Sequence, residues 1–181
     1  MFEDYQRWQR ELERQPVEFL PRRLDGLVEE ATARLAAEIG ARPDDLVPVT
    51  NATSGKNVVA RSLPLGPADE VLLTDHEYGA VDLLWQHVCA HTGATLVRAA
   101  VDAGPDLVDT MWRSVTPRTR VLSVSHLTSA TALRFPVEEI CRRARAQGVL
   151  VAVDGAHAPG QIDLELEGLQ ADFYAGSCHK W

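Results

Sequence analysis

A lysine near the end of the sequence and an aspartate upstream of it carry the most specific chemistry. Lys180 lies in the segment Cys178-His179-Lys180-Trp181, and its side-chain amine could condense with an aldehyde. Asp154 ends an apolar stretch, at the start of the turn Asp154-Gly155-Ala156-His157, where its carboxylate could hold a protonated heterocyclic nitrogen. A pyridoxal phosphate (PLP) site needs these two protein groups most, so the pair indicates that cofactor.

The segment Asn51-Ala52-Thr53-Ser54-Gly55 has the composition of an anion-binding turn. It follows residues 47–50, which we interpret as an apolar strand, and it precedes a helix. Small hydroxyl residues and a glycine let backbone N–H groups at a helix start approach a phosphate. Simple helix capping by one of the hydroxyls is the alternative. A Walker-type phosphate loop is excluded, because Thr50 replaces its earlier glycine and Asn57 its final Ser or Thr.

Two further turns carry aromatic or hydroxyl side chains. Asp75-His76-Glu77-Tyr78 offers an imidazole or a phenol that could stack on a cofactor ring, or else a helix cap with its phenol in the core. Ser125-His126-Leu127-Thr128-Ser129 offers hydroxyls for a phenolate oxygen, or is an ordinary turn. His157 could reach the same ligand as Asp154, although a histidine in a turn is often a surface residue and a strand-end aspartate often caps its turn.

Histidines and cysteines in other places do not predict a metal. His87 and His91 have helical i, i+4 spacing, but the glutamate of an HExxH motif and a third ligand are missing, so we expect no metal. Cys89, Cys141 and Cys178 form no CxxC pair, which favours reduced thiols over a zinc site or a disulfide framework.

Composition limits the class of protein. The chain has 181 residues, 24% charged and 45% hydrophobic, as in ordinary globular proteins. Its net charge of −8 argues against nucleic acid or an anionic membrane surface as the main partner. No apolar stretch approaches the ~18 residues of a membrane span, and the acidic N-terminus has no signal-like core. We therefore expect a cytoplasmic protein.

Apolar stretches and amphipathic segments alternate along most of the chain. Residues 1–45 predict a helical N-terminal segment, with a helix over 3–12, a turn at Pro16 and Pro21, and a long helix from Leu24 to Gly40. Residues 46–181 predict the cofactor-binding core. Its strands are expected at 70–73, 95–99, 120–124 and 149–153, and its helices at 55–63, 78–91, 106–114 and 137–147. Such alternation predicts an α/β fold with a mostly parallel sheet sandwiched by helices, and ligands at the carboxyl ends of the strands.

Taken together in this order, the motifs resemble those of the class V aminotransferase-like PLP enzymes of fold type I. The branch that looks most similar is that of the isopenicillin N epimerase-like proteins, related to cysteine desulfurases and kynureninases. The resemblance runs from the N-terminal helix to the final lysine motif. Its strongest segments are Asn51-Ala52-Thr53-Ser54-Gly55, Asp75-His76-Glu77-Tyr78-Gly79-Ala80, Ser125-His126-Leu127-Thr128-Ser129, Asp154-Gly155-Ala156-His157-Ala158-Pro159-Gly160 and Cys178-His179-Lys180-Trp181.

The resemblance implies a role for each matching residue. Lys180 is expected to form the Schiff base and then to move protons at the substrate's α carbon. Asp154 would bind the pyridinium nitrogen, and His157 the ring or its phenolic oxygen. His76 is the expected ring-stacking residue, with Tyr78 as a substrate-side acid or an alternative stacker. The remaining cofactor-binding positions are Ala52, Thr53, Ser177 and His179 for the phosphate and Thr128 for the ring oxygen.

The implied activity is PLP chemistry on an amino acid, with transamination, epimerisation and C–S lysis left open. The resemblance also implies that both ends of a longer enzyme are missing, including a small C-terminal domain. A homodimer or a complementing C-terminal chain is the expected partner. The alternatives are a truncated, catalytically inactive relic or interaction subunit with the same fold, and a phosphate-binding module for nucleotides.

Overall fold

Five parallel strands form a single sheet within residues 1–180, which are the residues that this computed structural model describes. The strands are hydrogen-bonded in the order β2–β1–β3–β4–β5. This arrangement confirms the α/β fold with a parallel sheet. The bounds are Glu70–Thr74 for β1, Thr95–Ala99 for β2, Thr119–Ser125 for β3, Leu150–Gly155 for β4 and Phe173–Gly176 for β5.

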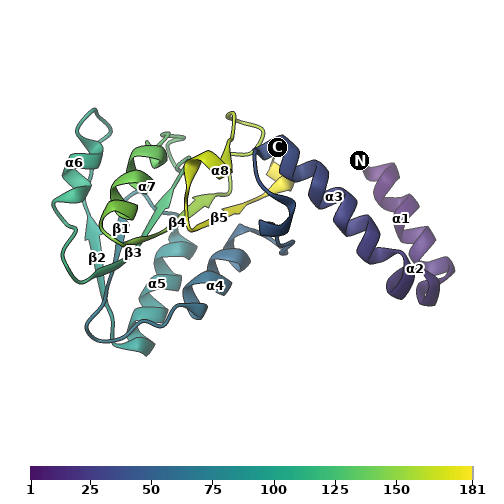
Figure 1. The fold of residues 1–181 in the computed structure, drawn as a ribbon, viewed down its shortest axis with the longest axis horizontal. Coiled ribbons are helices and arrows are strands. Elements are labelled where there is room, and N and C mark those ends of the chain that lie inside the picture. The colour runs from purple at the N-terminus through teal and green to yellow at the C-terminus, as the bar shows by residue number, and fades with distance from the viewer. Residues whose placement is uncertain (181) are drawn as a thin grey trace. The chain divides into compact units, whose positions relative to one another are not determined.

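Helices cover both faces of this sheet (Figure 1). One face carries α4 and α5, and the other carries α6, α7 and the short α8. The bounds are Ala52–Ser62 for α4, Gly79–Thr92 for α5, Leu107–Trp112 for α6, Val137–Ala146 for α7 and Leu166–Leu169 for α8. The sandwich explains why the central strands β1 and β4 contain consecutive apolar residues rather than alternating apolar and polar ones.

Alternate residues of β1 enter two different hydrophobic cores. Val71 and Leu73 pack with Trp85 of α5 on one face, whereas Leu72 packs with Met111 of α6 on the other. Successive side chains of a strand point to opposite faces, so a strand covered on both sides needs an apolar residue at every position. All five residues of β1 are buried.

The strand order brings the predicted polar turns to one edge. The chain runs from β1 outward to β2 and then returns to the other side of β1 through β3. The turns after β1 and β3 therefore flank a point where the strand order reverses, which is where parallel α/β sheets bind ligands. Register pairs then place Ser125 of β3 beside Asp154 of β4, and Asp154 beside Ala175 of β5.

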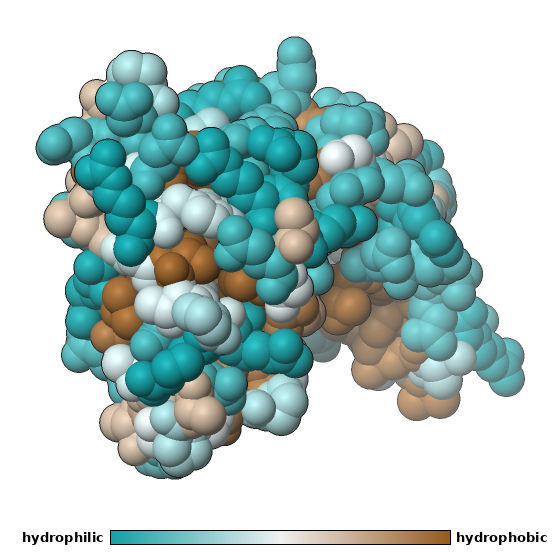
Figure 2. Space-filling view, turned by 60° about the vertical axis from the view of Figure 1, so that its left-hand side comes forward, coloured by the Kyte–Doolittle hydropathy of each residue, from teal (hydrophilic) through white to brown (hydrophobic). Residues whose placement is uncertain are grey.

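Residues 1–48 form a separate helical unit. Its elements are α1 (Phe2–Arg14), α2 (Pro16–Arg22), α3 (Leu24–Ile39) and the 3-10 turn η1 (Pro43–Asp45). Phe19 is buried there, and the Trp8 ring meets it edge-on with centroids 6.1 Å apart. The long helix ends at Gly40 as predicted, with a left-handed φ of 60° that a residue lacking Cβ adopts without strain. Phe2, Val17 and Leu20 of these helices are exposed apolar side chains, and Figure 2 shows hydrophobic surface on this unit.

Two local predictions are wrong. The prolines of the N-terminal segment do not form a turn but lie within α2: Pro16 occupies the first helical position, where no N–H donor is needed, and Pro21 lies inside the helix. Residues 47–50 form no strand in the described structure, and Pro48 lacks the N–H that a sheet ladder requires. The following helix accordingly begins at Ala52, earlier than expected.

None of the helices within residues 1–180 has both the length and the apolar character needed to cross a bilayer.

Candidate cofactor-binding site

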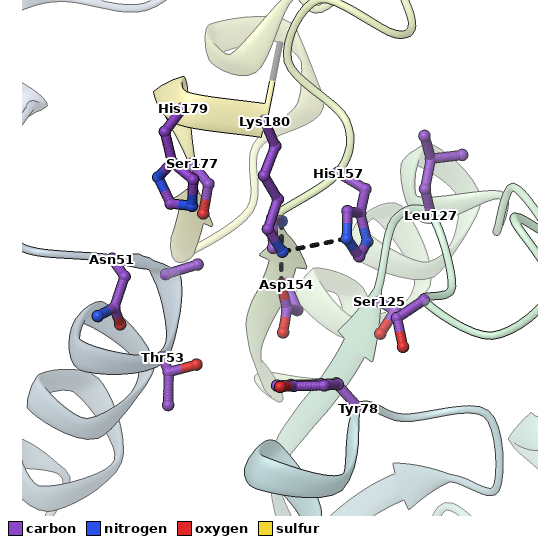
Figure 3. A pocket seen from close by; sticks show the side chains of 13 residues that line it. Asn51, Thr53, Tyr78, Ser125, Leu127, Asp154, His157, Ser177, His179 and Lys180 are labelled. Carbon is purple, nitrogen blue, oxygen red and sulfur yellow. Dashed lines mark hydrogen bonds between the residues drawn. The ribbon is translucent and has the colours of Figure 1, made fainter.

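A pocket at the carboxyl edge of the sheet collects most of the predicted polar turns. Its free space is about 510 Å³, a volume that includes the open solvent at its mouth. Figure 3 shows Lys180 entering the pocket from one side while the Tyr78 ring lies on the opposite side. The lining residues are Asn51, Ala52, Thr53, Tyr78, Ser125, Leu127, Ser129, Asp154, Ala156, His157, Ser177, His179 and Lys180.

Most predicted site residues converge here, and two do not. Those in the lining are Ala52, Thr53, Tyr78, Asp154, His157, Ser177, His179 and Lys180, whereas His76 and Thr128 are absent from it. Trp181, the last residue of the lysine motif, lies outside the described residues.

Lys180 is positioned by the 3-10 turn η2 (Cys178–Lys180), which follows the edge strand β5. Its Nζ lies 3.0 Å from Nε2 of His157, which belongs to the turn after β4 (Figure 3). A lysine nitrogen donates and an imidazole nitrogen can accept or donate, so a hydrogen bond joins the two side chains at this point of the pocket. The pair can thus supply an amine nucleophile next to an acceptor for its proton.

Asp154 lies near the end of β4 and is almost fully buried. Its Oδ1 accepts a hydrogen bond of 3.0 Å from the N–H of Ala156, which fixes the orientation of the carboxylate. The next residue is Gly155, where a Cβ atom would overlap the ring of Tyr174 on β5. A carboxylate this poor in solvent favours a cationic partner, such as a protonated ring nitrogen.

The start of α4 forms the anion-binding side of the pocket. Asn51 caps the helix by accepting the N–H of Ser54 at 2.8 Å, and Gly55 N–H bonds to the Asn51 carbonyl. The N–H groups of the first helical residues, Ala52 and Thr53, have no acceptor within an α-helix and carry its positive dipole end. With the Ser177 hydroxyl and His179 in the same lining, this is a donor set suited to a phosphate.

Tyr78, rather than His76, is the aromatic side chain in the pocket. The Nε2–H of His76 donates to the carbonyl of Val101 at 2.8 Å, and its ring packs edge-on against Phe135. Tyr78 precedes α5, and its ring lies across the pocket from Lys180 (Figure 3). The expected stacking role of His76 is therefore not supported by its position, because its polar edge is already used by the backbone.

Thr128 is likewise turned away from the pocket. Its hydroxyl pairs with that of Thr131 at 2.7 Å and accepts the N–H of Leu133 at 2.9 Å. These bonds close the turn after β3, and the side chain is buried. The hydroxyl of Ser125 lies in the lining instead, although it also donates to Glu77 at 2.8 Å.

A buried lysine lies beneath the pocket, and the sequence analysis did not identify it. Lys56 of α4 is 1% exposed, and its Nζ donates to Ser123 Oγ at 2.8 Å and to the Ala152 carbonyl at 2.7 Å. Burial lowers the pKa of Lys56 to about 8, against the opposing effect of the negative charges of Asp154 and Glu77. The sequence does contain a signal, because Ala52, Lys56 and Ala60 recur at helical spacing on the buried face.

Glu77 is the second charged group beneath the pocket. Its carboxylate accepts hydrogen bonds from Thr74 Oγ1, Ser125 Oγ and the Ser125 N–H. Burial raises the pKa of Glu77, and these hydrogen bonds and the Lys56 charge partly offset that effect. Glu77 lies in a turn that the sequence predicts to be functional, but the predicted roles there fall to the aromatic residues His76 and Tyr78.

Within residues 1–180, no group of three or more His, Cys, Asp or Glu side chains has the geometry to hold a metal ion. The two histidines of α5 contact one another, with ring centroids 4.0 Å apart, and His91 Nδ1 donates to the His87 carbonyl. The groups that line the pocket are thus the Lys180 amine, the Asp154 carboxylate, the start of α4 and the Tyr78 ring.

Comparison with known proteins identifies the family. The model of the aminotransferase class-V family matches residues 2–181, so the chain belongs to this family. It is 41% identical over 173 residues to isopenicillin N epimerase of Amycolatopsis lactamdurans and 40% identical over 171 residues to that of Streptomyces clavuligerus. The family resemblance expected from the motifs is confirmed.

A solved structure shares the fold. A C-DES mutant with glycine covalently linked to its PLP cofactor superposes with a TM-score of 0.82 at 29% identity. The match covers 87% of this chain but 43% of that one. The two epimerases are likewise covered to 44% and 43%, against 92% of this chain, so the chain spans less than half the length of these relatives.

Proposed function

We propose that this chain forms the PLP site of an aminotransferase class-V enzyme that acts on an amino acid through Lys180. The observation that carries the proposal is the convergence of Lys180, Asp154 and the start of α4 on one pocket. Each group comes from a different element, and each suits a different part of the cofactor: aldehyde, ring nitrogen and phosphate.

The residues present fit this group. Ala52 and Thr53 at the α4 start, with Ser177 and His179, would hold the phosphate, and Asp154 would hold the ring nitrogen in its protonated form. The Tyr78 ring would pack against the cofactor, the contact expected earlier of His76. When bound, PLP supplies an electron sink for a bond breaking at the α carbon of an amino acid.

Lys180 has two tasks in this proposal. Its amine would hold the cofactor through the aldehyde, and it would also be placed to carry a proton to or from the α carbon of the substrate. His157, 3.0 Å from that amine, accepts or returns the proton of Lys180. The proposal leaves open transamination, epimerisation and C–S lysis, because the relatives extend well beyond the part that this chain matches.

Reductive trapping tests the proposal directly. The sequence contains two lysines, Lys56 and Lys180, so a cofactor adduct can be mapped without ambiguity. Purified chain is mixed with PLP, reduced with borohydride, digested and analysed by mass spectrometry, alongside Lys180→Ala. We expect a visible absorbance band and a trapped adduct on Lys180, both missing from the variant.

The alternatives make different predictions in the same experiment. A chain that folds but gives no Lys180 adduct would indicate an inactive relic or interaction subunit. An adduct equally abundant in Lys180→Ala, on the N-terminal amine, would indicate nonspecific reaction and would contradict the proposal. If the adduct forms, amino acids are then screened for their ability to change the absorbance band.

A further inference from the structure

The buried lysine of α4 joins the walls of the pocket from below. Lys56 lies one helical turn after Ala52, whose backbone is at the proposed phosphate end. Its Nζ reaches across to β3 and β4, where it donates to Ser123 Oγ and to the Ala152 carbonyl. One side chain thus ties the helix to two strands of the sheet.

The attachment points are in register with the pocket residues. Ser123 pairs with Ala152 across β3 and β4, and Ser125 pairs with Asp154 two residues further along the same strands. Residues i and i+2 of a strand point to the same face, about 7 Å apart. Lys56 therefore bonds to β3 and β4 two residues before Asp154, the carboxylate proposed to hold the ring nitrogen.

We propose that Lys56 is a positioning residue that sets the spacing between the start of α4 and Asp154. This inference rests on the proposed function, since that spacing is the distance between a phosphate site and a ring-nitrogen site. A ligand that has both a phosphate and a pyridine nitrogen must satisfy both ends at once. A ligand with the ring alone needs only one of them.

The chemistry of this position favours a hydrogen-bonding role for Lys56 over a purely space-filling one. A buried ammonium group is costly unless it is hydrogen-bonded and its charge is compensated. Lys56 has two hydrogen bonds, and the carboxylates of Asp154 and Glu77 supply nearby negative charge. An apolar side chain of similar length could fill the same volume, but it could not donate hydrogen bonds to β3 and β4.

The test compares two ligands that differ in the phosphate. Dissociation constants for PLP and for pyridoxal are measured by absorbance on the wild-type chain, on Lys56→Met and on Arg61→Met. Arg61 lies on the exposed side of the same helix and is the matched control. We expect Lys56→Met to weaken PLP binding on the order of tenfold and pyridoxal binding by less than about threefold, with both unchanged in Arg61→Met.

Several outcomes would overturn the inference. Equal losses for the two ligands would assign Lys56 a general structural role, while the proposed function would survive. Unchanged PLP binding in Lys56→Met would also reject it. If the wild-type chain forms no Lys180-dependent adduct, the proposed function itself fails and the inference fails with it.

A milder variant keeps the test decisive if Lys56→Met does not fold. Ser123→Ala removes one of the two hydrogen bonds and leaves the lysine in place. We expect a smaller loss with the same selectivity for PLP over pyridoxal. A folded Ser123→Ala chain with unchanged PLP binding would contradict the proposal.

Discussion

Nζ of Lys180 and Nε2 of His157 lie 3.0 Å apart, although the two residues come from different turns at the edge of the sheet. At this distance one nitrogen donates an N–H to the lone pair of the other. The amine attacks a carbonyl only after it has lost its proton, so the histidine is placed where it can serve as the acceptor.

Substitution of His157 is expected to slow cofactor capture. In His157→Ala the band from added PLP should develop on the order of 10²-fold more slowly, at the lower end of what proton transfer contributes. Stopped-flow absorbance measures the rate constant. His91→Ala, in which an exposed histidine of α5 is removed, should react at the wild-type rate. A wild-type rate in His157→Ala would show that the histidine does not take the proton.

The buried lysine predicts a rise of stability at alkaline pH. The pKa of Lys56 is about 8 in the folded chain and 10.5 when exposed, so between these values the unfolded chain binds more protons. Stability must therefore increase as the pH rises from about 8 to 10.5, by on the order of 3 kcal/mol from this group. Urea unfolding at intervals across that range measures the free energy of unfolding.

Lys56→Met isolates this effect from that of other buried groups. Burial raises the pKa of Cys141 to about 12 and also raises the pKa of Tyr174, and both shifts lower stability as the pH rises. These groups are present in both proteins, so the difference between wild type and Lys56→Met reports the lysine. A difference that stays constant with pH would contradict the burial of Lys56.

Two substitutions of Asn51, the residue that caps α4, distinguish its effect on stability from its effect on anion binding. Asn51→Ala should lower the free energy of unfolding by about 0.5–2 kcal/mol, because the N–H of Ser54 loses its acceptor. Asn51→Asp should keep the cap and the stability, yet weaken PLP binding by roughly tenfold or more, because it adds negative charge to the lining. Urea unfolding and absorbance titration measure the two quantities. Equal PLP affinity in Asn51→Asp and wild type would exclude a phosphate at this end of the pocket.

The residue after Asp154 tolerates no side chain. Gly155→Ala would drive a methyl group into the Tyr174 ring, whose hydroxyl bonds to Nδ1 of His126, and we expect a loss of about 1–3 kcal/mol. Gly104→Ala is the control, since nothing lies within 4 Å of its Cβ position and its effect should stay within about 0.5 kcal/mol. Urea unfolding distinguishes the two. Equal stability of both variants would contradict the close packing of β4 on β5.

The fold and the pocket edge were predictable because they depend on pattern. The three central residues of β1, Val71 to Leu73, are all apolar and all buried, as expected for a strand in a sheet covered on both faces. Parallel strands end at one edge of the sheet, so residues far apart in sequence, such as Tyr78 after β1 and Asp154 at the end of β4, were expected to meet there. Residue type and order were sufficient for these elements.

Side-chain direction was not predictable in the same way. His76 and Tyr78 stand in one turn and both are aromatic, but the Val101 carbonyl takes the polar edge of the first and leaves the second for the pocket. The hydroxyl of Thr128 bonds to Thr131 within its own turn and so does not face the pocket. Lys56 went unrecognised because a lysine is expected at the surface, and its partners on β3 and β4 are distant in sequence.

The two lysines also make the chain a reporter of its own unfolding. An amine-directed acylating reagent meets Lys180 in the exposed 3-10 turn at once, whereas Lys56 is 1% exposed and hydrogen-bonded beneath the pocket. Acylation of Lys56 therefore requires α4 to leave the sheet, and its rate follows the frequency of that opening. The mass of the peptide that contains Lys56 would then report local opening at the pocket. Acylation of Lys180 would serve as the internal standard for the activity of the reagent.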